Sequence, residues 1–475
     1  MLLKDILASE NGFKYCIDDL NIQSSIGRNY LMNISWKSTP EELEYEWLFV
    51  EQILEKMNGE ETSKLLVKIQ HKLGCIHNIK QTILNIENED IIDDIQLFEI
   101  KNLALLSSEI STLAKEADLD LLFLIPDLSE VLAILDPDKN NIAHFYIYES
   151  YDNRLTEIRN TLKRLTNKLD SCRQSLSENE IADWESQITD IYNLNQSIED
   201  EVRKKLVEKL KRHSLILKAV LERLAYIDLS IAKAEQALKW KMCKPVINNT
   251  NIAYTNLFNP RLKNSLEQRK QRYQHIDINI KEGVCLITGA NMAGKTVLLK
   301  TMGIAQLLAQ FGFFIPATTA NITLVDKVVF CIGDEQNEIN GLSSFASEIL
   351  KINDIITNSQ YHKMLVLIDE PARTTNPTEG KAIVQAIAEI MGMKNSYSLI
   401  TTHYSQLGTN CRKLRVKGFV ESGIDNNNIT PQNINQYIDY SLQEDTSDNV
   451  PHEALRIAEI LNCDATLIST AKKFI

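Results

Sequence analysis

Glycine is scarce at the start of this chain, where only four of its 16 glycines precede residue 283. Neither glycine nor proline occurs between Pro137 and Pro245. A stretch without helix breakers or tight-turn formers predicts long helices. Twelve glycines follow from Gly283 onward, so the second half of the chain is expected to have a different architecture.

Paired cysteines, membrane-length apolar runs and an excess of positive charge are also missing. The eight cysteines include no C-x-x-C pair, which argues against a zinc site or a disulfide framework and favours a reducing cytoplasm. The apolar run at 297–317 contains Lys300 and two glycines, and residues 1–5 lack a signal pattern, so neither a membrane span nor secretion is expected. The net charge of −13 does not favour nucleic acid, although local basic patches can still bind it.

The segment up to residue 245 is predicted to be helical. Helices are expected at 42–56 and 97–117, and apolar residues at helical spacing form one stripe over 217–238. Residues 160–213 are more polar and predict a projecting antiparallel helical hairpin, with a flexible charged linker as the alternative. Its narrower apolar stripes consist of Leu162, Leu165, Leu169, Ile188, Ile191 and Leu194.

From residue 246 the pattern changes to strands that alternate with helices. Strands are expected at 276–280, 284–288, 328–332, 364–368 and 399–401. Helices are expected between them at 297–314, from Ser344 and from Thr378. This order predicts an α/β domain with a largely parallel sheet, so the fold class is a helical region followed by α/β.

Residues 289–296 read G-A-N-M-A-G-K-T and fit the G-x-x-x-x-G-K-[ST] pattern of phosphate-binding loops. A buried strand precedes the loop and an apolar helix follows it, as phosphate binding requires. Backbone N–H groups of such a loop wrap the phosphates of ATP, aided by the helix N-terminus. Lys295 can reach the β- and γ-phosphates, and the Thr296 hydroxyl can ligate Mg²⁺. The expected nucleotide-binding residues are Gly289, Ala290, Asn291, Met292, Ala293, Gly294, Lys295 and Thr296.

Two later strands end in residues that suit phosphate chemistry. The strand at 364–368 leads into Asp369, which is expected to hold Mg²⁺ through water, and Glu370, which is expected to polarise the attacking water. The alternative is an ordinary strand that ends in acidic surface residues. The strand at 399–401 leads to His403, which either positions that water or is only a hydrogen-bonded histidine in a turn.

Ser343 and two basic clusters each have a structural and a functional interpretation. Ser343 precedes a helix, so it is either an N-cap or a phosphate contact at the helix N-terminus. For each basic cluster a solvated helix face competes with phosphate binding. The clusters comprise Arg203, Lys204, Lys205, Lys209, Lys211 and Arg212, and then Arg261, Lys263, Arg269, Lys270 and Arg272.

Several of these segments resemble the ATPase domain of MutS-type proteins, in the same order along the chain. Residues 288–296 are similar to the family's T-G-P-N-M-[GA]-G-K-[ST], whose Asn-Met pair is specific to that group. Residues 309–317 resemble A-Q-x-G-x-[FY]-V-P-A, and residues 343–348 resemble the signature loop S-T-F-x-x-E. Leu367–Glu370 and Thr401–Tyr404 match the remaining ATPase motifs.

The resemblance implies an ABC-type ATPase that dimerises head to tail, with a second copy or with a related MutS-like subunit. ATP would lie between the phosphate loop of one subunit and the signature loop of the other, so that Ser343 contacts it across the interface. Ala290 replaces a proline of the family pattern, and residues 371–376 replace a glycine-rich loop. These departures bear on the rate of hydrolysis rather than on nucleotide binding.

The resemblance also assigns chemical roles to the candidate residues. Lys295, Glu370 and His403 would be the catalytic residues. Thr296 and Asp369 would ligate the Mg²⁺ that accompanies ATP.

The resemblance further implies a division of the chain and a choice of functions. Residues 1–245 would form a MutS-like helical core, lever and short clamp-like arm, and residues 246–475 the ATPase domain with a C-terminal helical dimerisation segment. Neither a mismatch-reading domain nor a nuclease tail is recognisable. The ending at 439–458 resembles short MutS-related proteins, some of which are thought to reactivate cobalamin-dependent lysine or ornithine aminomutases. The functions that remain open are an ATPase clamp on mismatched or branched DNA, an aminomutase reactivase and an ATP-gated scaffold.

Overall fold

The chain forms two compact units. The computed structural model describes residues 1–7, 11–174, 176–289, 293–333, 344–404, 407–419, 437–445, 455, 458–459 and 463–474. Unit 1 comprises Met1–Leu20, Ile34–Glu51 and Lys233–Ile475, and unit 2 comprises Asn21–Asn33 and Gln52–Ala232. The domain boundary between residues 245 and 246 that the sequence suggests stays a prediction.

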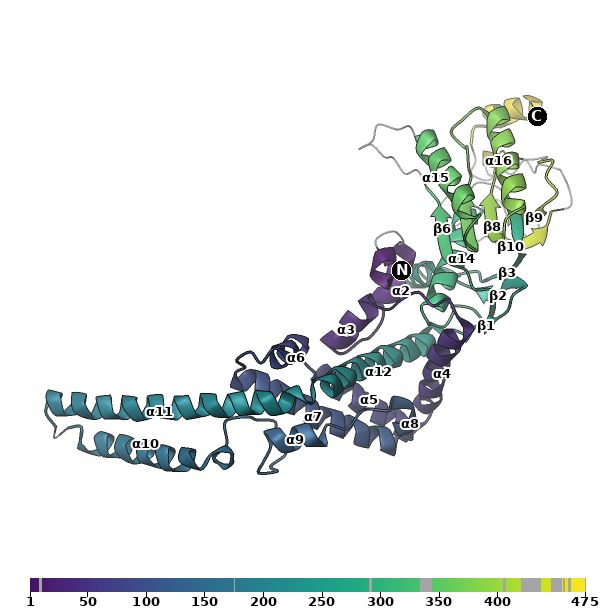
Figure 1. The fold of residues 1–475 in the computed structure, drawn as a ribbon. Coiled ribbons are helices and arrows are strands. Elements are labelled where there is room, and N and C mark those ends of the chain that lie inside the picture. Colours follow the sequence, from purple (N-terminus) through teal and green to yellow (C-terminus); the bar gives the residue numbers. More distant parts are fainter. Residues whose placement is uncertain are drawn as a thin grey trace. The chain divides into compact units, whose positions relative to one another are not determined.

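Unit 2 is built from helices, as the sequence predicted (Figure 1). Its helices are α3 (Ser25–Met32), α5 (Glu60–Gly74), α6 (Lys80–Glu87), α7 (Asp94–Glu116), α8 (Asp120–Phe123), α9 (Ser129–Leu135), the 3₁₀ turn η1 (Glu149–Tyr151), α10 (Asn153–Cys172) and α11 (Glu178–Lys211). Two further helices, α4 (Pro40–Met57) and α12 (Ser214–Trp240), contribute residues to both units.

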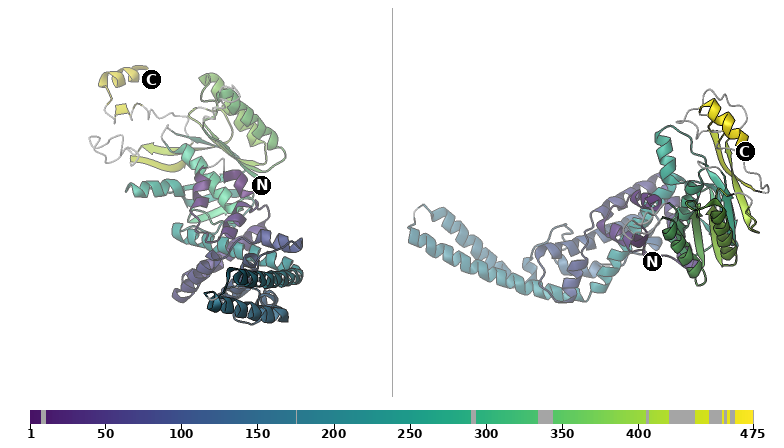
Figure 2. Two further views of the ribbon diagram at one scale, coloured as in Figure 1. Left: turned by 90° about the vertical axis from the view of Figure 1, so that its left-hand side faces the viewer. Right: turned by 90° about the horizontal axis from the view of Figure 1, so that it is seen from above.

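Helices α10 and α11 lie side by side as a hairpin (Figures 1 and 2). The predicted hairpin is therefore confirmed, and the alternative of a flexible linker is wrong. Leu169 of α10 and Ile198 of α11 are buried. Leu194, which belongs to an apolar stripe of the sequence, is 52% exposed, whereas its neighbour Asn195 is buried.

Unit 1 contains a six-stranded sheet with the order β10-β9-β4-β8-β7-β6 among the described residues. Neighbouring strands run parallel except for the antiparallel pair of β9 and β10, so the predicted, largely parallel sheet is confirmed. The strands are β4 (Gly283–Thr288), β6 (Lys327–Cys331), β7 (Met364–Asp369), β8 (Ser396–Thr401), β9 (Arg412–Phe419) and β10 (Ile438–Glu444).

A second sheet of unit 1 has the order β1-β5-β2-β3 and was only partly foreseen. Its strands are β1 (Val246–Ile247), β2 (Asn251–Leu257), β3 (Ile276–Lys281) and β5 (Thr319–Ile322). The helices of unit 1 are α1 (Leu3–Leu7), α2 (Asn11–Asp18), α13 (Pro260–Gln268), α14 (Lys295–Gln310), α15 (Ser344–Asn358), α16 (Pro377–Gly392), α18 (Ala465–Ala471) and the 3₁₀ turn η5 (Lys472–Phe474). No helix within the described ranges combines the length and hydropathy that crossing a lipid bilayer requires.

Helices cover both faces of the six-stranded sheet. Along β7, Val366 and Ile368 pack with buried residues of α15 and α16 on one face. Leu367 points to the other face, because side chains alternate along a strand. There α14 approaches so closely that a Cβ at Gly303 would lie 2.2 Å from Phe330 Cζ and 2.8 Å from Leu367 Cδ1. This packing fixes the start of α14 against the carboxyl ends of the central strands.

Candidate nucleotide site

The candidate site lies where β4, β8 and β7 end side by side. Strand β8 lies between β4 and β7, and Thr401 at its end pairs in register with Asp369. The loop that follows β4 and the acidic residues that end β7 therefore meet at one edge of the sheet. Ligands of open α/β sheets bind at this carboxyl edge.

The described part of the phosphate loop depends on glycine at two positions. Gly289 has φ +142°, and a Cβ there would lie 3.3 Å from Cβ of Val416. Gly294 has φ +72° and forms the N-cap of α14. L-residues rarely adopt these conformations, so the backbone needs both glycines. The predicted residues Ala290, Asn291 and Met292 lie outside the described residues.

Lys295 joins the phosphate loop to the end of β7. Its side chain is 4% exposed, and Nζ lies 3.2 Å from Oε1 of Glu370. The same ammonium donates a hydrogen bond to the carbonyl oxygen of Gly289 at 2.7 Å. A buried ammonium needs such acceptors, because an unpaired buried charge is costly. The lysine is therefore held at the mouth of the loop.

Asp369 sits between two threonine hydroxyls. Thr296 Oγ1 donates to Oδ2 of Asp369 at 2.6 Å, and Thr401 Oγ1 donates to Oδ1 at 2.6 Å. A hydroxyl and a carboxylate are the hard oxygen donors that Mg²⁺ takes, together with water and substrate phosphates. The donor set at this point therefore fits Mg²⁺.

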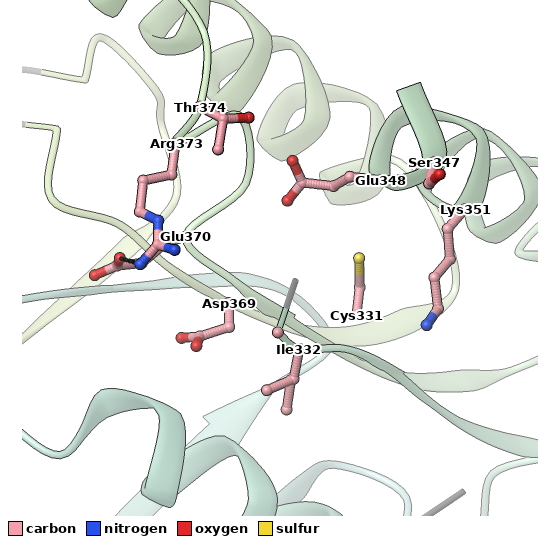
Figure 3. Close-up of a pocket in the computed structure, with 10 residues that line it drawn as sticks. Cys331, Ile332, Ser347, Glu348, Lys351, Asp369, Glu370, Arg373 and Thr374 are labelled. Carbon is pink, nitrogen blue, oxygen red and sulfur yellow. Dashed lines mark ion pairs between the residues drawn. The ribbon is translucent and has the colours of Figure 1, made fainter. Parts of the chain in front are cut away.

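Glu370 is surrounded by cations and lies close to His403. Arg373 Nη1 lies 3.7 Å from Glu370 Oε2 (Figure 3). Partial burial lowers the pKa of His403. The charges of Lys295 and Arg373 act in the same direction, whereas that of Glu370 opposes them. The ring is consequently neutral at neutral pH.

A cavity of about 650 Å³ opens beside the phosphate loop. Tyr440 of β10 packs against the loop, since a Cβ on Gly294 would lie 3.0 Å from its Cδ1. Tyr273 lines the same cavity. Two aromatic rings beside a phosphate site suit a nucleotide base, and the volume falls within the usual range of ligand sites.

Gln274 holds Tyr440 in this place. Its Oε1 accepts from Tyr440 N at 3.1 Å, and its Nε2 donates to Asp439 Oδ1 at 2.7 Å. Burial of Asp439 works against ionisation, but hydrogen bonds from Gln274 and Ser441 hold its pKa at about 2. The carboxylate therefore stays charged and keeps β10 attached to Gln274, in the segment that precedes β3.

A smaller hollow of about 70 Å³ lies on the other side of Asp369 and Glu370. Glu348 and Lys351 of α15 point toward it, opposite the loop that carries Arg373 (Figure 3). Glu348 Oε2 accepts a hydrogen bond from the backbone N–H of Ala372 at 3.2 Å. The start of α15 is thus connected to the loop that follows β7.

The structure brings most of the predicted site residues together. Contacts join Lys295 to Glu370 and Thr296 to Asp369, and His403 lies within electrostatic range of them. Ser343 lies outside the described residues, so its role stays a prediction. Sequence reasoning missed Thr401, Arg373, Tyr273, Tyr440, Gln274 and the contact of Glu348. The sequence carries no signal for the role of Thr401, because its pairing with Asp369 depends on the register of β7 with β8.

The basic clusters of the sequence have different surroundings. Arg203 of α11 contacts Asp94 and Asp200 at 2.8 and 2.7 Å, and Lys211 contacts Glu89 at 2.6 Å. In the second cluster, Arg272 lines the cavity beside the phosphate loop. The ion pairs of the first cluster agree with the interpretation that this cluster is a solvated helix face.

A strand, a glycine loop, a helix and a second parallel strand of the same sheet that leads into Asp-Glu define the class of phosphate-loop ATPase domains. Residues 285–475 match the family model described as MutS domain V, which is an ABC-type ATPase domain. Over this region the chain is related to the MutS domain V family, in agreement with the predicted resemblance.

Similar proteins include several described as Endonuclease MutS2. The protein from Geobacillus thermodenitrificans is 34% identical over 210 residues, which are 44% of this chain and 26% of the relative. That from Thermus thermophilus is 34% identical over 208 residues, with 44% and 27% covered. That from Caldicellulosiruptor saccharolyticus is 38% identical over 189 residues, with 39% and 23% covered. The matches span about a quarter of these relatives' own length.

Proposed function

We propose that this protein is a Mg²⁺-dependent ATPase whose nucleotide site is completed by a second subunit. The observation that carries the proposal is the convergence of Lys295 with Glu370 and of Thr296 with Asp369 at one edge of the sheet. ATP binding and hydrolysis would change the contacts between subunits, and the helical region would respond to that change.

Nucleotide binding has to rearrange the lysine. The ammonium of Lys295 pairs with Glu370 and donates a hydrogen bond to the carbonyl oxygen of Gly289. Phosphate oxygens carry more charge than a carbonyl oxygen, so ATP would attract the ammonium and weaken its pairing with Glu370. The freed carboxylate can then polarise a water molecule, and the neutral ring of His403 can accept a hydrogen bond from that water.

Thr296 and Asp369 would hold the metal ion. Mg²⁺ bound there would neutralise charge that develops on the phosphate oxygens. Thr401 keeps the Asp369 carboxylate oriented through its hydroxyl hydrogen bond. Tyr273 and Tyr440 would contact the base.

The second subunit would supply Ser343. Sequence resemblance and membership of MutS domain V support a head-to-tail dimer, formed by two copies or with a related MutS-like subunit. The phosphate loop and the end of β7 would form one side of such a composite site. An ATP-gated scaffold that scarcely hydrolyses remains the alternative, and the rate of hydrolysis distinguishes the two.

Glu370→Gln tests the mechanism. The amide cannot accept the proton of the attacking water, so phosphate release should fall by about 10²-fold or more, while ATP binding persists. Both are measured on the full chain, by phosphate release and by equilibrium binding of ATP. Glu389→Gln, at an exposed position of α16, is the matched control. Normal turnover by Glu370→Gln would show that another residue activates the water.

The ion pairs of the arm, which is the hairpin of α10 and α11, favour a protein client over DNA. Arg203 and Lys211 already pair with acidic groups of the same unit, which leaves less positive charge for phosphates. We therefore favour remodelling of a client enzyme, such as a cobalamin-dependent aminomutase, over clamping of mismatched or branched DNA. The matches cover only about a quarter of the relatives described as endonucleases, so that description gives no support for nuclease activity of this chain.

A further inference from the structure

The turn that follows β7 has an unfavourable backbone. Glu370 has φ +47° and Ala372 has φ +61°, and neither residue is glycine. A side chain in the left-handed region crowds the backbone, so such residues persist only where neighbouring groups hold them. The direction of the Glu370 carboxylate therefore depends on whatever holds this turn.

Three side chains hold the turn, from β8, from the segment that follows β8 and from α15. Thr401 Oγ1 of β8 accepts from Glu370 N at 2.9 Å. Tyr404 donates its hydroxyl to the carbonyl of Ala372 at 3.2 Å. Glu348 Oε2 accepts from Ala372 N at 3.2 Å, and Ala372 is completely buried. Glu348 is the charged member of the set, and a charged acceptor makes a stronger hydrogen bond than a neutral one.

Glu348 belongs to α15, whose first residue is Ser344. Its carboxylate reaches from that helix toward the turn that carries Glu370 and Arg373 (Figure 3). A shift of α15 must therefore move or break the hydrogen bond to Ala372. Helix α15 is also the element that follows Ser343, the residue expected to meet the partner subunit's nucleotide.

We propose that Glu348 is a positioning residue for ATP hydrolysis, which fixes the turn at Ala372 and so aims the carboxylate of Glu370. It touches no reacting atom and acts through the backbone of the turn. By the same contact, a displacement of the start of α15 alters the direction of Glu370. This inference rests on the proposed function and adds a route by which a partner subunit regulates it.

The test compares Glu348→Ala and Glu348→Gln in the full chain. Glu348→Ala should lower kcat by about tenfold, in keeping with the loss of one charge-assisted hydrogen bond. KM and the binding of ATP should change by less than twofold, because the phosphate loop is untouched. Glu348→Gln retains an oxygen acceptor and should recover most of kcat. Thermal unfolding of each variant checks that the domain is folded.

Ala372→Gly provides a rescue that a merely structural role of Glu348 does not predict. Glycine adopts the left-handed conformation without a side-chain tether. The double variant Glu348→Ala/Ala372→Gly should therefore regain several-fold in kcat over Glu348→Ala. An unchanged kcat in Glu348→Ala, a defect confined to KM, or the absence of rescue would each overturn the inference.

Failure of this inference differs from failure of the proposed function. If the wild-type chain releases no phosphate, or if Glu370→Gln hydrolyses ATP normally, the proposed function fails. If Glu370→Gln is inactive while Glu348→Ala turns over at the wild-type rate, only the inference about Glu348 fails. Glu389→Gln again serves as the control that should keep full activity.

Discussion

His403 has a charge state that its surroundings set. Burial lowers the pKa of His403 below the ordinary value of 6.5, so its neutral imidazole ring takes up a second proton only at more acidic pH. A neutral ring that orients water should lose its effect as pH falls through the lowered pKa. We expect kcat to be flat near neutral pH and to decline below it. His403→Gln should show about tenfold lower kcat and should lack that decline.

The pH profile of phosphate release at saturating ATP measures this effect. His362 lies before β7 and serves as the control, so His362→Gln should keep the wild-type profile. A His403→Gln variant with unchanged kcat and profile would leave His403 with only a structural role in its turn.

Individual residues differed in how far the sequence could predict them. The phosphate loop was predictable from the spacing of Gly289, Lys295 and Thr296, because the local backbone conformation and the contacts with phosphate require those residue types. Asp369 and Glu370 were recognisable because an apolar strand ends in them. Arg373 and Thr401 could not be assigned in this way, since their contacts depend on a turn geometry and on the register between β7 and β8.

At the scale of elements, β10 supplies the residue that closes the cavity beside the phosphate loop. Gln274 attaches Tyr440 to this place, and the ring packs on Gly294. Stacking of an aromatic ring on a base contributes about 1–3 kcal/mol. Tyr440→Ala should therefore weaken ATP binding by about fivefold or more, whereas Tyr440→Phe should bind like the wild type.

Inorganic triphosphate provides the matched probe for this prediction. It carries the phosphates of ATP without a base, so its affinity should be the same in Tyr440→Ala and in the wild type. Equal weakening of both ligands in a titration would mean that Tyr440 supports the phosphate loop instead of the base.

Elements were predictable where local pattern and tertiary packing agree. The stretch between Pro137 and Pro245 contains α10, α11 and α12, as the absence of breakers indicated. Residues 136–152 nevertheless form no α-helix. There the buried Lys101 of α7 binds Asp136 Oδ1 at 3.1 Å and the carbonyl of His144 at 3.0 Å. Hydrogen bonds between residues 35 or more positions apart override the helix propensity of this segment, and the composition does not reveal them.

At the scale of the whole molecule, the net charge of −13 is unevenly distributed. Residues 178–202 of α11 contain eight acidic residues and neither lysine nor arginine. Arg154 and Arg159 of α10 pair with Glu201 and Glu199 of α11. The arm thus neutralises part of its positive charge internally. The sequence alone suggested a basic cluster at residues 203–212, because it does not show that Asp94 lies beside Arg203 and Glu89 beside Lys211.

This distribution predicts the response of ATP turnover to candidate clients. A polyanion is repelled by the acidic part of α11, so DNA should bind only weakly, with Kd above about 10⁻⁶ M at physiological salt. Branched or mismatched DNA should not change the rate of phosphate release, even at low salt, where phosphate contacts are strongest. An inactivated cobalamin-dependent aminomutase should raise that rate. Glu370→Gln should bind the same client without turnover. Submicromolar DNA binding that stimulates hydrolysis would instead make this chain a DNA clamp, and the preference for a protein client would be wrong.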